Sequence, residues 1–455
     1  MEEPRPVLRD RDRIDCTGLA RADFEAGRER GDPSARLGTM AGKLKGSEIL
    51  KIAASIRAMV KSGVDICNLT VGDFSPAQFR VPGLLADGIR AALERGETNY
   101  PPSIGVPQLR EAVQRFYARE LGLEYPLESI AIASGARPLI YGTYRTLIDP
   151  GDKVVYPVPS WNNNHYSTLL KATPVEVRCG PEKRFLPTPD ALLKELPGAR
   201  LVCMNSPLNP TGTAITREAL TGISEAIVAE NRGREQRGEK PVYLLYDHIY
   251  WMLCFGETRH YTPVELVPEM ARYTIFIDGI SKAFAATGLR VGWTVGPVDV
   301  IKRMTPAIGH MGAWAPRPEQ LASALLLDDP EGIRAYHREF KSATQARLDL
   351  LHEGVQALKA AGQPVDSIPP MGAIYLTVRL APFGRVTPGG VVLRTNEDVR
   401  KYVLERANIG IVPFQAFGYP GDEGWFRMSV GAVGLDDIRR AMPRLGAALR
   451  ELKPA

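Results

Sequence analysis

Apolar residues recur along the chain with two different periods. In residues 46–63 and 105–122 they return every three or four positions, as Ile52, Ile56 and Val60 do, which is typical of helices with one buried face. Farther along, short apolar runs alternate with helix-like stretches. The runs are SIAIAS, KVVYPV, PVEVRC, RLVCMN, VYLLYD, YTIFID and LRVGWTV. Several are apolar on consecutive positions, so we predict an α/β fold with a mostly parallel sheet covered by helices.

The same patterns divide the chain into parts. Residues 1–40 are rich in Arg, Asp and Glu and have few large apolar groups, which predicts a mobile or partly ordered arm. The alternating pattern occupies residues 76–329 and predicts a large domain. From residue 330 the chain returns to long amphipathic helices. We expect residues 330–455 to form a smaller α+β domain together with residues 41–75.

The composition narrows the class of protein. The 455 residues carry a net charge of +5, which suits small anions and does not indicate a nucleic-acid partner. The five cysteines stand singly without a C-x-x-C motif, so no structural zinc, other metal site or disulfide framework is expected. The first residues lack the apolar core of a signal peptide, and no apolar run approaches about 18 residues. We therefore expect a reduced, cytoplasmic protein without a membrane partner.

Polar residues follow several of the predicted strands. Ligands of a parallel sheet bind where strands end and loops begin, so these residues are candidates for a site. Asp247 ends VYLLYD, and a carboxylate there is costly to bury without a partner. Lys282 follows YTIFIDGI, with Ser281 and Arg290 nearby as groups that could bind an anion. The plain alternatives are a helix cap for Asp247 and a solvated surface position for Lys282.

Two loops and a C-terminal run add further candidates. The loop ASGARPL opens a helix, where Gly135, Ala136 and Arg137 could present backbone N–H groups to a phosphate. The motif NSPLNPTG holds Asn209 in a stiff loop, for which a tight turn is the alternative. Arg427 lies inside the apolar run WFRMSV and needs a partner, which is either a substrate carboxylate or an internal salt bridge.

The order and spacing of these residues resemble those of the class I and II aminotransferases, and of aspartate aminotransferases in particular. This family belongs to the pyridoxal-phosphate fold-type I superfamily. The resemblance covers about residues 41–450. Its most specific parts are NYPPSIGVPQLREAV, NSPLNPTG, SKAFAATGLRVGW and FRMSVG. It implies a large domain that binds pyridoxal 5'-phosphate and a smaller α+β domain.

The resemblance also implies roles for individual residues. Lys282 is expected to form the Schiff base with pyridoxal phosphate and then to shuttle a proton between substrate and cofactor. Asp247 is expected to pair with the pyridinium nitrogen, and Asn209 and Tyr250 with the phenolic oxygen. Trp161 is expected to stack on the ring, with ordinary core packing as the alternative. The residues expected at the phosphate are Gly135, Ala136, Arg137, Ser281, Arg290 and, from the neighbouring subunit, Tyr100.

The implied reaction is the transfer of an amino group from an L-amino acid to a 2-oxo acid through pyridoxamine phosphate. Arg427 is expected to bind the substrate α-carboxylate, with Gly72 and Asn209 beside it. The frequency of donors in the family favours aspartate or another acidic or aromatic amino acid, since no residue that binds the donor side chain can be read here. A Tyr100 that crosses between subunits implies a homodimer with shared active sites.

Two alternatives stay open. The same cofactor residues serve a C–S lyase or another β/γ-eliminating or cyclising enzyme, because the pocket selects the bond that breaks. A non-catalytic regulator with an appended DNA-binding domain is disfavoured, since residues 1–40 are short and lack a helix-turn-helix pattern. Departures from the family pattern fall near the expected substrate pocket and leave its specificity open. They are His248 after the acidic strand end, Phe414 and Gln415 in place of small residues, and residues 309–318.

Overall fold

The computed structural model describes residues 38, 40, 46, 48–161 and 163–454. The chain divides into two compact units, Met1–Gly46 and Ser47–Ala455. The sheets and the helices packed on them lie in the second unit. The predicted arm, residues 1–40, falls almost wholly outside the described residues.

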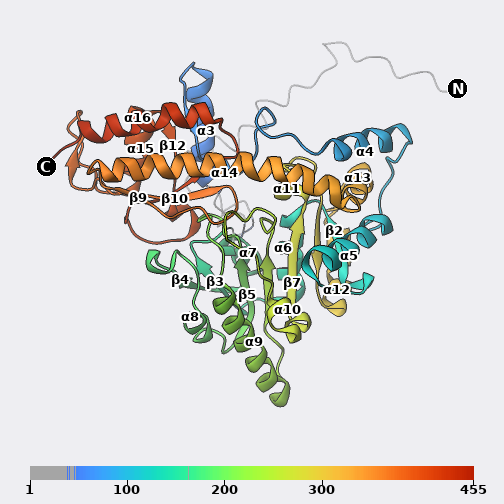
Figure 1. The fold of residues 1–455 in the computed structure, drawn as a ribbon. Helices are drawn as coiled ribbons and strands as arrows, with labels where there is room; N and C mark the ends of the chain where they lie inside the picture. The colour runs from blue at the N-terminus through green and yellow to red at the C-terminus, as the bar shows by residue number, and fades with distance from the viewer. Residues whose placement is uncertain (1–37, 39, 41–45, 47, 162, 455) are drawn as a thin grey trace, which may run out of the picture. The chain divides into compact units, whose positions relative to one another are not determined.

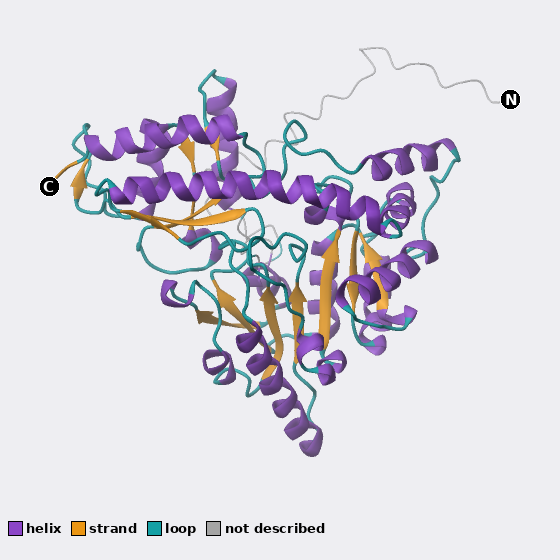
Figure 2. Ribbon diagram, in the orientation of Figure 1, coloured by secondary structure: helices purple, strands orange, loops and turns teal. Residues whose placement is uncertain are grey.

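A seven-stranded sheet organises the first part of this unit (Figure 1, Figure 2). Its strands run in the order β2-β8-β7-β6-β5-β3-β4, and β8 alone is antiparallel to its neighbours. Their bounds are β2 Ile130–Ala133, β3 Lys153–Val158, β4 Thr173–Arg178, β5 Ala199–Asn205, β6 Tyr243–Asp247, β7 Thr274–Gly279 and β8 Gly292–Val295. The parallel strands place their carboxyl ends at one edge, which is where this fold binds ligands.

Helices cover both faces of this sheet. Leu244 of β6 packs on one side with α5, α8, α9 and α13, whereas Leu245 packs on the other with α6, α7 and α12. Neighbouring strand residues point to opposite faces, so a strand buried on both faces needs consecutive apolar residues. The helices are α4 Gly83–Glu94, α5 Pro107–Leu121, α6 Ala136–Leu147, α7 Asn163–Leu170, α8 Pro189–Leu193, α9 Arg217–Arg237, α10 Pro263–Leu266, α11 Ile280–Ala283, α12 Val298–His310 and α13 Arg317–Leu327.

An antiparallel sheet of four strands, in the order β13-β14-β10-β9, lies in the C-terminal part. Its strands are β9 Val365–Ser367, β10 Tyr375–Leu380, β13 Val412–Pro413 and β14 Trp425–Ser429. The sheet shares a core with the helices α14 Pro330–Ala360, α15 Asn396–Ala407 and α16 Leu435–Glu451. Two further pairs join β1 Cys67–Asn68 to β12 Ile409–Gly410, and β11 Arg385–Val386 to β15 Lys453–Pro454. The β1–β12 pair joins the segment after α3 Glu48–Lys61 to the C-terminal part.

The predicted fold class is confirmed, with differences in detail. β4 is an edge strand with mostly exposed residues, so it is not covered on both faces. The domain boundaries at residues 75/76 and 329/330 stay predictions. In the part of the chain that the structure describes, no helix has both the length and the apolar character of a membrane span.

Candidate active site

The carboxyl ends of β5, β6 and β7 meet at one edge of the large sheet. Asn205, Asp247 and Ile277 lie at matching positions in these three strands. β7 then ends at Gly279, and the short helix α11 that follows carries Lys282. Polar groups from distant parts of the sequence converge here, as expected for the ligand-binding edge of a parallel sheet.

Lys282 lies among backbone and aromatic groups. Its Nζ donates a hydrogen bond to the Gly72 carbonyl oxygen at 2.6 Å and lies 5.9 Å from the ring centroids of Phe74 and Tyr250. Burial, opposed by Asp73 and aided by nearby arginines, lowers the pKa of Lys282 to about 8. An amine with this pKa has a usable unprotonated fraction near neutral pH, which a nucleophile or a base requires.

Asp247 is the strand-end carboxylate of the cluster. Its Oδ1 accepts a hydrogen bond from the backbone N–H of Ile249 at 3.2 Å, and its carbonyl oxygen accepts one from Asn205 Nδ2 at 2.7 Å. Burial raises the pKa of Asp247 to about 7, while the Ile249 N–H and Lys282 act in the opposite direction. No cation among the described residues forms a salt bridge with Asp247, so a positively charged ligand would stabilise the ionised form.

Arg427 is a buried guanidinium with an incomplete set of partners. Its side chain is 1% exposed, Nη1 donates to Asn209 Oδ1 at 3.0 Å, and Nη2 donates to the Thr70 carbonyl oxygen at 2.6 Å. Its Nε has no hydrogen-bond partner, and within the described ranges no carboxylate pairs with it. The internal salt bridge, which was one of two alternatives for Arg427, is therefore not found among the described residues. A buried unpaired cation is costly, and its fork of donors suits a carboxylate ligand.

The start of α6 and Arg290 form a narrow cradle. Gly135 has a φ of +90°, and a Cβ at this position would collide with the Arg290 guanidinium. Arg290 Nη2 donates to the Ser134 carbonyl oxygen at 3.0 Å, and Nη1 donates to that of Thr287 at 2.7 Å. Ala136 is the first residue of α6, and the first N–H groups of a helix have no partner within it. Together with the guanidinium, these groups can bind an anion such as a phosphate.

A row of aromatic and cationic side chains extends from Arg427 to Arg137. The Phe417 ring lies 4.9 Å from Arg427 Cζ, and its centroid is 6.4 Å from that of Trp161. The guanidinium of Arg137 lies 5.3 Å from the Trp161 ring. Trp161 therefore lies between two arginines, in a position to contact a flat ligand.

Two of the sequence-predicted residues need separate mention. Ser281 is buried next to Lys282 in α11. Tyr100 is 81% exposed and packs edge-to-face with Trp314, with ring centroids 5.2 Å apart. Its contact is with the 309–318 segment and not with the cluster around Lys282.

Sequence analysis missed two residues of the cluster. The Tyr375 hydroxyl lies 2.6 Å from that of Tyr250, and its ring centroid lies 4.6 Å from Arg427 Cζ. Asp73 Oδ1 accepts hydrogen bonds from the Thr287 hydroxyl and from the backbone N–H of Phe74. Asp73 directly follows Gly72, a predicted site residue, and this position in the sequence was enough to indicate it. Tyr375 carried none, because it is one residue of an apolar strand.

A second buried polar cluster lies on the opposite face of β6 and β7. Asp278 accepts hydrogen bonds from Trp251 Nε1 at 2.9 Å and from the Gly279 N–H at 2.7 Å. His248 Nε2 lies 2.8 Å from the Tyr117 hydroxyl. Burial raises the pKa of Asp278 to about 8 and holds the pKa of His248 well below its ordinary value. This cluster is therefore largely uncharged near pH 7.

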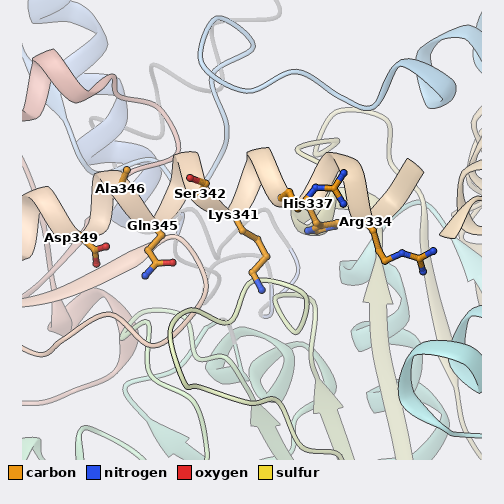
Figure 3. A pocket seen from close by; sticks show the side chains of 8 residues that line it. Arg334, His337, Lys341, Ser342, Gln345, Ala346 and Asp349 are labelled. Carbon is orange, nitrogen blue, oxygen red and sulfur yellow. The ribbon is translucent and has the colours of Figure 1, made fainter. Parts of the chain in front are cut away.

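A groove of about 670 Å³ follows one face of α14 (Figure 3). Arg334, Arg338 and Lys341 line it, together with Asp349. The hydrogen bonds around Lys282 and Arg427 involve none of these residues. The groove is therefore separate from the candidate site.

Known proteins share both the fold and the motifs of this chain. Residues 64–445 match the family described as aminotransferase class I and II. The chain belongs to this aminotransferase family. The aspartate aminotransferase of Rhizobium meliloti strain 1021 is 31% identical over 411 residues, which cover 89% of this chain and 94% of that protein. The aspartate aminotransferase of Geobacillus stearothermophilus is 29% identical and covers 90% of this chain and 98% of its own length.

Solved aminotransferase structures agree with this assignment. The crystal structure of the aspartate aminotransferase from Rhizobium meliloti superposes with a TM-score of 0.83 at 30% identity, over 92% of this chain and all of that one. That of Thermus thermophilus with maleate gives a TM-score of 0.79 at 28% identity, over 91% and 99%. The family predicted from the motifs is therefore confirmed, and the protein is a transaminase of fold type I.

Proposed function

We propose that this aminotransferase binds pyridoxal 5'-phosphate at Lys282 and transfers the amino group of aspartate, or of a related acidic or aromatic amino acid, to a 2-oxo acid. One observation carries the proposal. A partly neutralised lysine, a buried carboxylate without a cation and a buried arginine without an anion converge at one sheet edge. Each lacks what the cofactor and an amino-acid substrate together would supply.

The residues present fit the cofactor. Arg427 Nε lacks a partner that a carboxylate could supply, and Arg290 packs against Gly135 beside the first N–H groups of α6, so that several donors suited to a phosphate lie together. Lys282 would hold the aldehyde carbon, and Asp247 the ring nitrogen. The other residues proposed to hold the cofactor are Tyr100, Gly135, Ala136, Arg137, Trp161, Asn209, Tyr250, Ser281 and Arg290. When bound, pyridoxal phosphate supplies the electron sink that makes the substrate α-carbon acidic.

The chain's own groups would divide the remaining work. Lys282 Nζ, whose pKa is lowered to about 8, would take the proton from the substrate α-carbon and return it at the cofactor. Arg427 would bind the α-carboxylate through its fork and fix the α-carbon within reach, with Gly72 and Asn209 beside it. Asp247 would stay ionised beside a protonated ring nitrogen and so keep that proton in place.

An acidic donor is the substrate class that the site favours. Relatives are named aspartate aminotransferase and aspartate/prephenate aminotransferase. Besides Arg427, a second guanidinium, Arg137, lies close enough to lower the pKa of Lys282 and stands over Trp161. Two cations suit a donor with two carboxylates better than one with an apolar side chain.

A homodimer is part of the same proposal. Tyr100 is largely exposed, although it is a large aromatic residue, and it adjoins the unusual 309–318 segment. Delivery of its hydroxyl to the phosphate of a second copy would explain that exposure. Placement in the cytoplasm stays a prediction.

The test is a panel of amino acids added singly to the cofactor-loaded protein without an acceptor. Aspartate should convert the cofactor to its amine form, with one equivalent of 2-oxo acid released per site and no ammonia. Continuous release of ammonia or thiol with a 2-oxo acid, and no accumulation of the amine form, would instead establish the lyase alternative. No spectral change with any acidic or aromatic donor would refute the proposed substrate class.

A further inference from the structure

Tyr375 lies between Arg427, the residue proposed to bind the substrate carboxylate, and Tyr250, which is proposed to contact the cofactor. It is the first residue of β10, which pairs with β14 so that Thr377 lies opposite Arg427. Tyr375 is therefore a diagonal neighbour of Arg427 on the same face of the small sheet. Its side chain is 1% exposed, so its polar group depends on partners inside the protein.

Three contacts define its surroundings. The Tyr375 hydroxyl shares a hydrogen bond of 2.6 Å with the Tyr250 hydroxyl, and the two rings meet edge-to-face with centroids 5.6 Å apart. The Arg427 guanidinium stands over the Tyr375 ring at 4.6 Å. A Cβ on Gly72 would come within 2.7 Å of the Tyr375 hydroxyl oxygen. Tyr375 thus contacts Arg427, Tyr250 and Gly72. The Gly72 carbonyl oxygen is the group that accepts a hydrogen bond from Lys282.

The position of Arg427 favours one of the two directions that the Tyr250–Tyr375 hydrogen bond can take. Burial raises the pKa of both tyrosines, and the positive charge of Arg427 opposes this most strongly at Tyr375. Either hydroxyl can donate in this pair, and the guanidinium over the Tyr375 ring favours the arrangement in which Tyr375 donates to Tyr250. Tyr250 then keeps its own hydrogen free for a third group. The hydrogen bond that Tyr250 accepts from Tyr375 also makes the Tyr250 hydroxyl a stronger donor, because hydrogen bonds in a chain polarise one another.

We propose that Tyr375 is a positioning residue that couples the occupancy of the Arg427 clamp to the donor strength of Tyr250. This inference rests on the proposed function. When a carboxylate neutralises Arg427, the bias that makes Tyr375 the donor weakens, and Tyr250 donates less strongly to the cofactor's phenolic oxygen. Substrate binding at one end of the site is thereby communicated to the proton shared at the other end.

The experiment follows the visible absorbance of the cofactor-loaded protein as a function of pH, with and without saturating maleate, an unreactive dicarboxylate. Tyr375→Phe keeps the ring under Arg427 and removes only the hydroxyl. A weaker donor at Tyr250 leaves the phenolic oxygen holding the shared proton more tightly. We expect the pH midpoint to rise by about 0.5 to 1 unit, the equivalent of one hydrogen bond. The further shift caused by maleate should shrink.

Tyr402→Phe is the matched control. Its hydroxyl is also buried and donates to the Ala448 carbonyl oxygen at 2.6 Å, within the C-terminal part. This variant should titrate like the unmodified protein, although it loses a hydrogen bond of the same kind. Urea unfolding of each unloaded variant checks that it is folded, so that a spectral change reports the site.

A double variant separates coupling from packing. If Tyr375 acts through Tyr250, adding Tyr375→Phe to Tyr250→Phe should not move the midpoint further. Additive shifts, or a Tyr375→Phe protein that titrates like the unmodified one with and without maleate, would overturn the inference and leave the proposed function standing. An unmodified protein without any visible band would overturn both.

Discussion

The two faces of β6 and β7 carry buried polar clusters that differ in one respect. On one face, Asp278, Trp251, Tyr117 and His248 bind one another and are largely uncharged near pH 7. On the other, the groups around Lys282 include the guanidinium of Arg427, whose Nε has no partner. We call the first cluster closed, because its four side chains bind one another, and the second open, because Arg427 Nε has no partner. Burial is similar, so the missing partners, and not depth, distinguish a ligand site from a structural one.

The largest expected effect comes from Lys282→Ala in the open cluster. Removal of the amine eliminates both the covalent attachment and the proton transfer. We expect transamination to fall by on the order of 10⁴-fold or more, since general acid–base catalysis alone supplies up to that factor. Lys341→Ala, in the groove on α14, is the matched control and should leave the rate unchanged. Equal rates for the two variants would remove Lys282 from the chemistry.

The next effect comes from Arg427→Lys, which retains the charge but loses the fork of donors. Donor KM should rise and kcat/KM should fall, by an equivalent of about 2–5 kcal/mol, because one partner of a buried charge pair is impaired. Steady-state kinetics with aspartate measure this. Arg115→Lys, at the exposed salt bridge to Asp328, serves as control and should change kcat/KM little. If Arg427→Lys also leaves kcat/KM intact, the clamp is not the carboxylate site.

A smaller effect is expected from Gly72→Ala. The added Cβ would lie 2.7 Å from the Tyr375 hydroxyl, which must shift, whereas its distance of 3.6 Å to Arg427 Nη1 is an ordinary contact. Misplacement of this size costs about 10- to 100-fold in rate. Gly83→Ala is the control, because a Cβ at that position meets no atom within 4 Å. If both substitutions prove harmless, the site is looser around Gly72 than the contacts imply.

The smallest effect on activity is expected in the closed cluster, where Asp278→Asn should act on stability instead. The pKa of Asp278 is raised to about 8, so the folded protein binds more protons than the unfolded chain between about pH 4 and 8. The free energy of unfolding should therefore decline as the pH rises through this window. The contribution of the Asp278 carboxyl to this decline in the free energy of unfolding is on the order of 1 kcal/mol per pH unit.

Urea unfolding at several pH values measures this share as the difference between the unmodified protein and Asp278→Asn. Cofactor loading should leave the sign of this difference unchanged, because burial is the main cause of the raised pKa of Asp278. Loading should remove the corresponding contribution of Asp247, whose pKa is raised to about 7 in the unloaded protein. Parallel pH profiles for the two proteins would show that Asp278 is already ionised in the folded state.

The open cluster could be predicted further than the closed one, because its residues stand at strand ends. Asp247 and Lys282 each follow an apolar run, and a parallel sheet brings such positions together. Asp278 ends the run YTIFID as Asp247 ends VYLLYD, but its pairing with Trp251 depends on which face each side chain takes. The edge position of β4 and the reversed direction of β8 likewise depend on strand order, which periodicity does not encode.

Tyr375 shows the same limit within the site itself. Its contact with Tyr250 spans 125 positions and depends on how two sheets meet. Nothing in the sequence separates it from the other apolar positions of β10. The unpaired Nε of Arg427 is likewise a property of packing, whereas the need of Arg427 for a partner was readable from its apolar neighbours.

The most direct test of the central claim is to map the cofactor's attachment point. The loaded protein is treated with borohydride, which reduces the carbon–nitrogen double bond to a stable amine, and its peptides are analysed by mass spectrometry. The account predicts a single pyridoxyl group on the peptide that contains Lys282, and none in the Lys282→Ala variant. A label on another lysine, such as Lys341, or the absence of any label from a protein that transaminates aspartate, would contradict it.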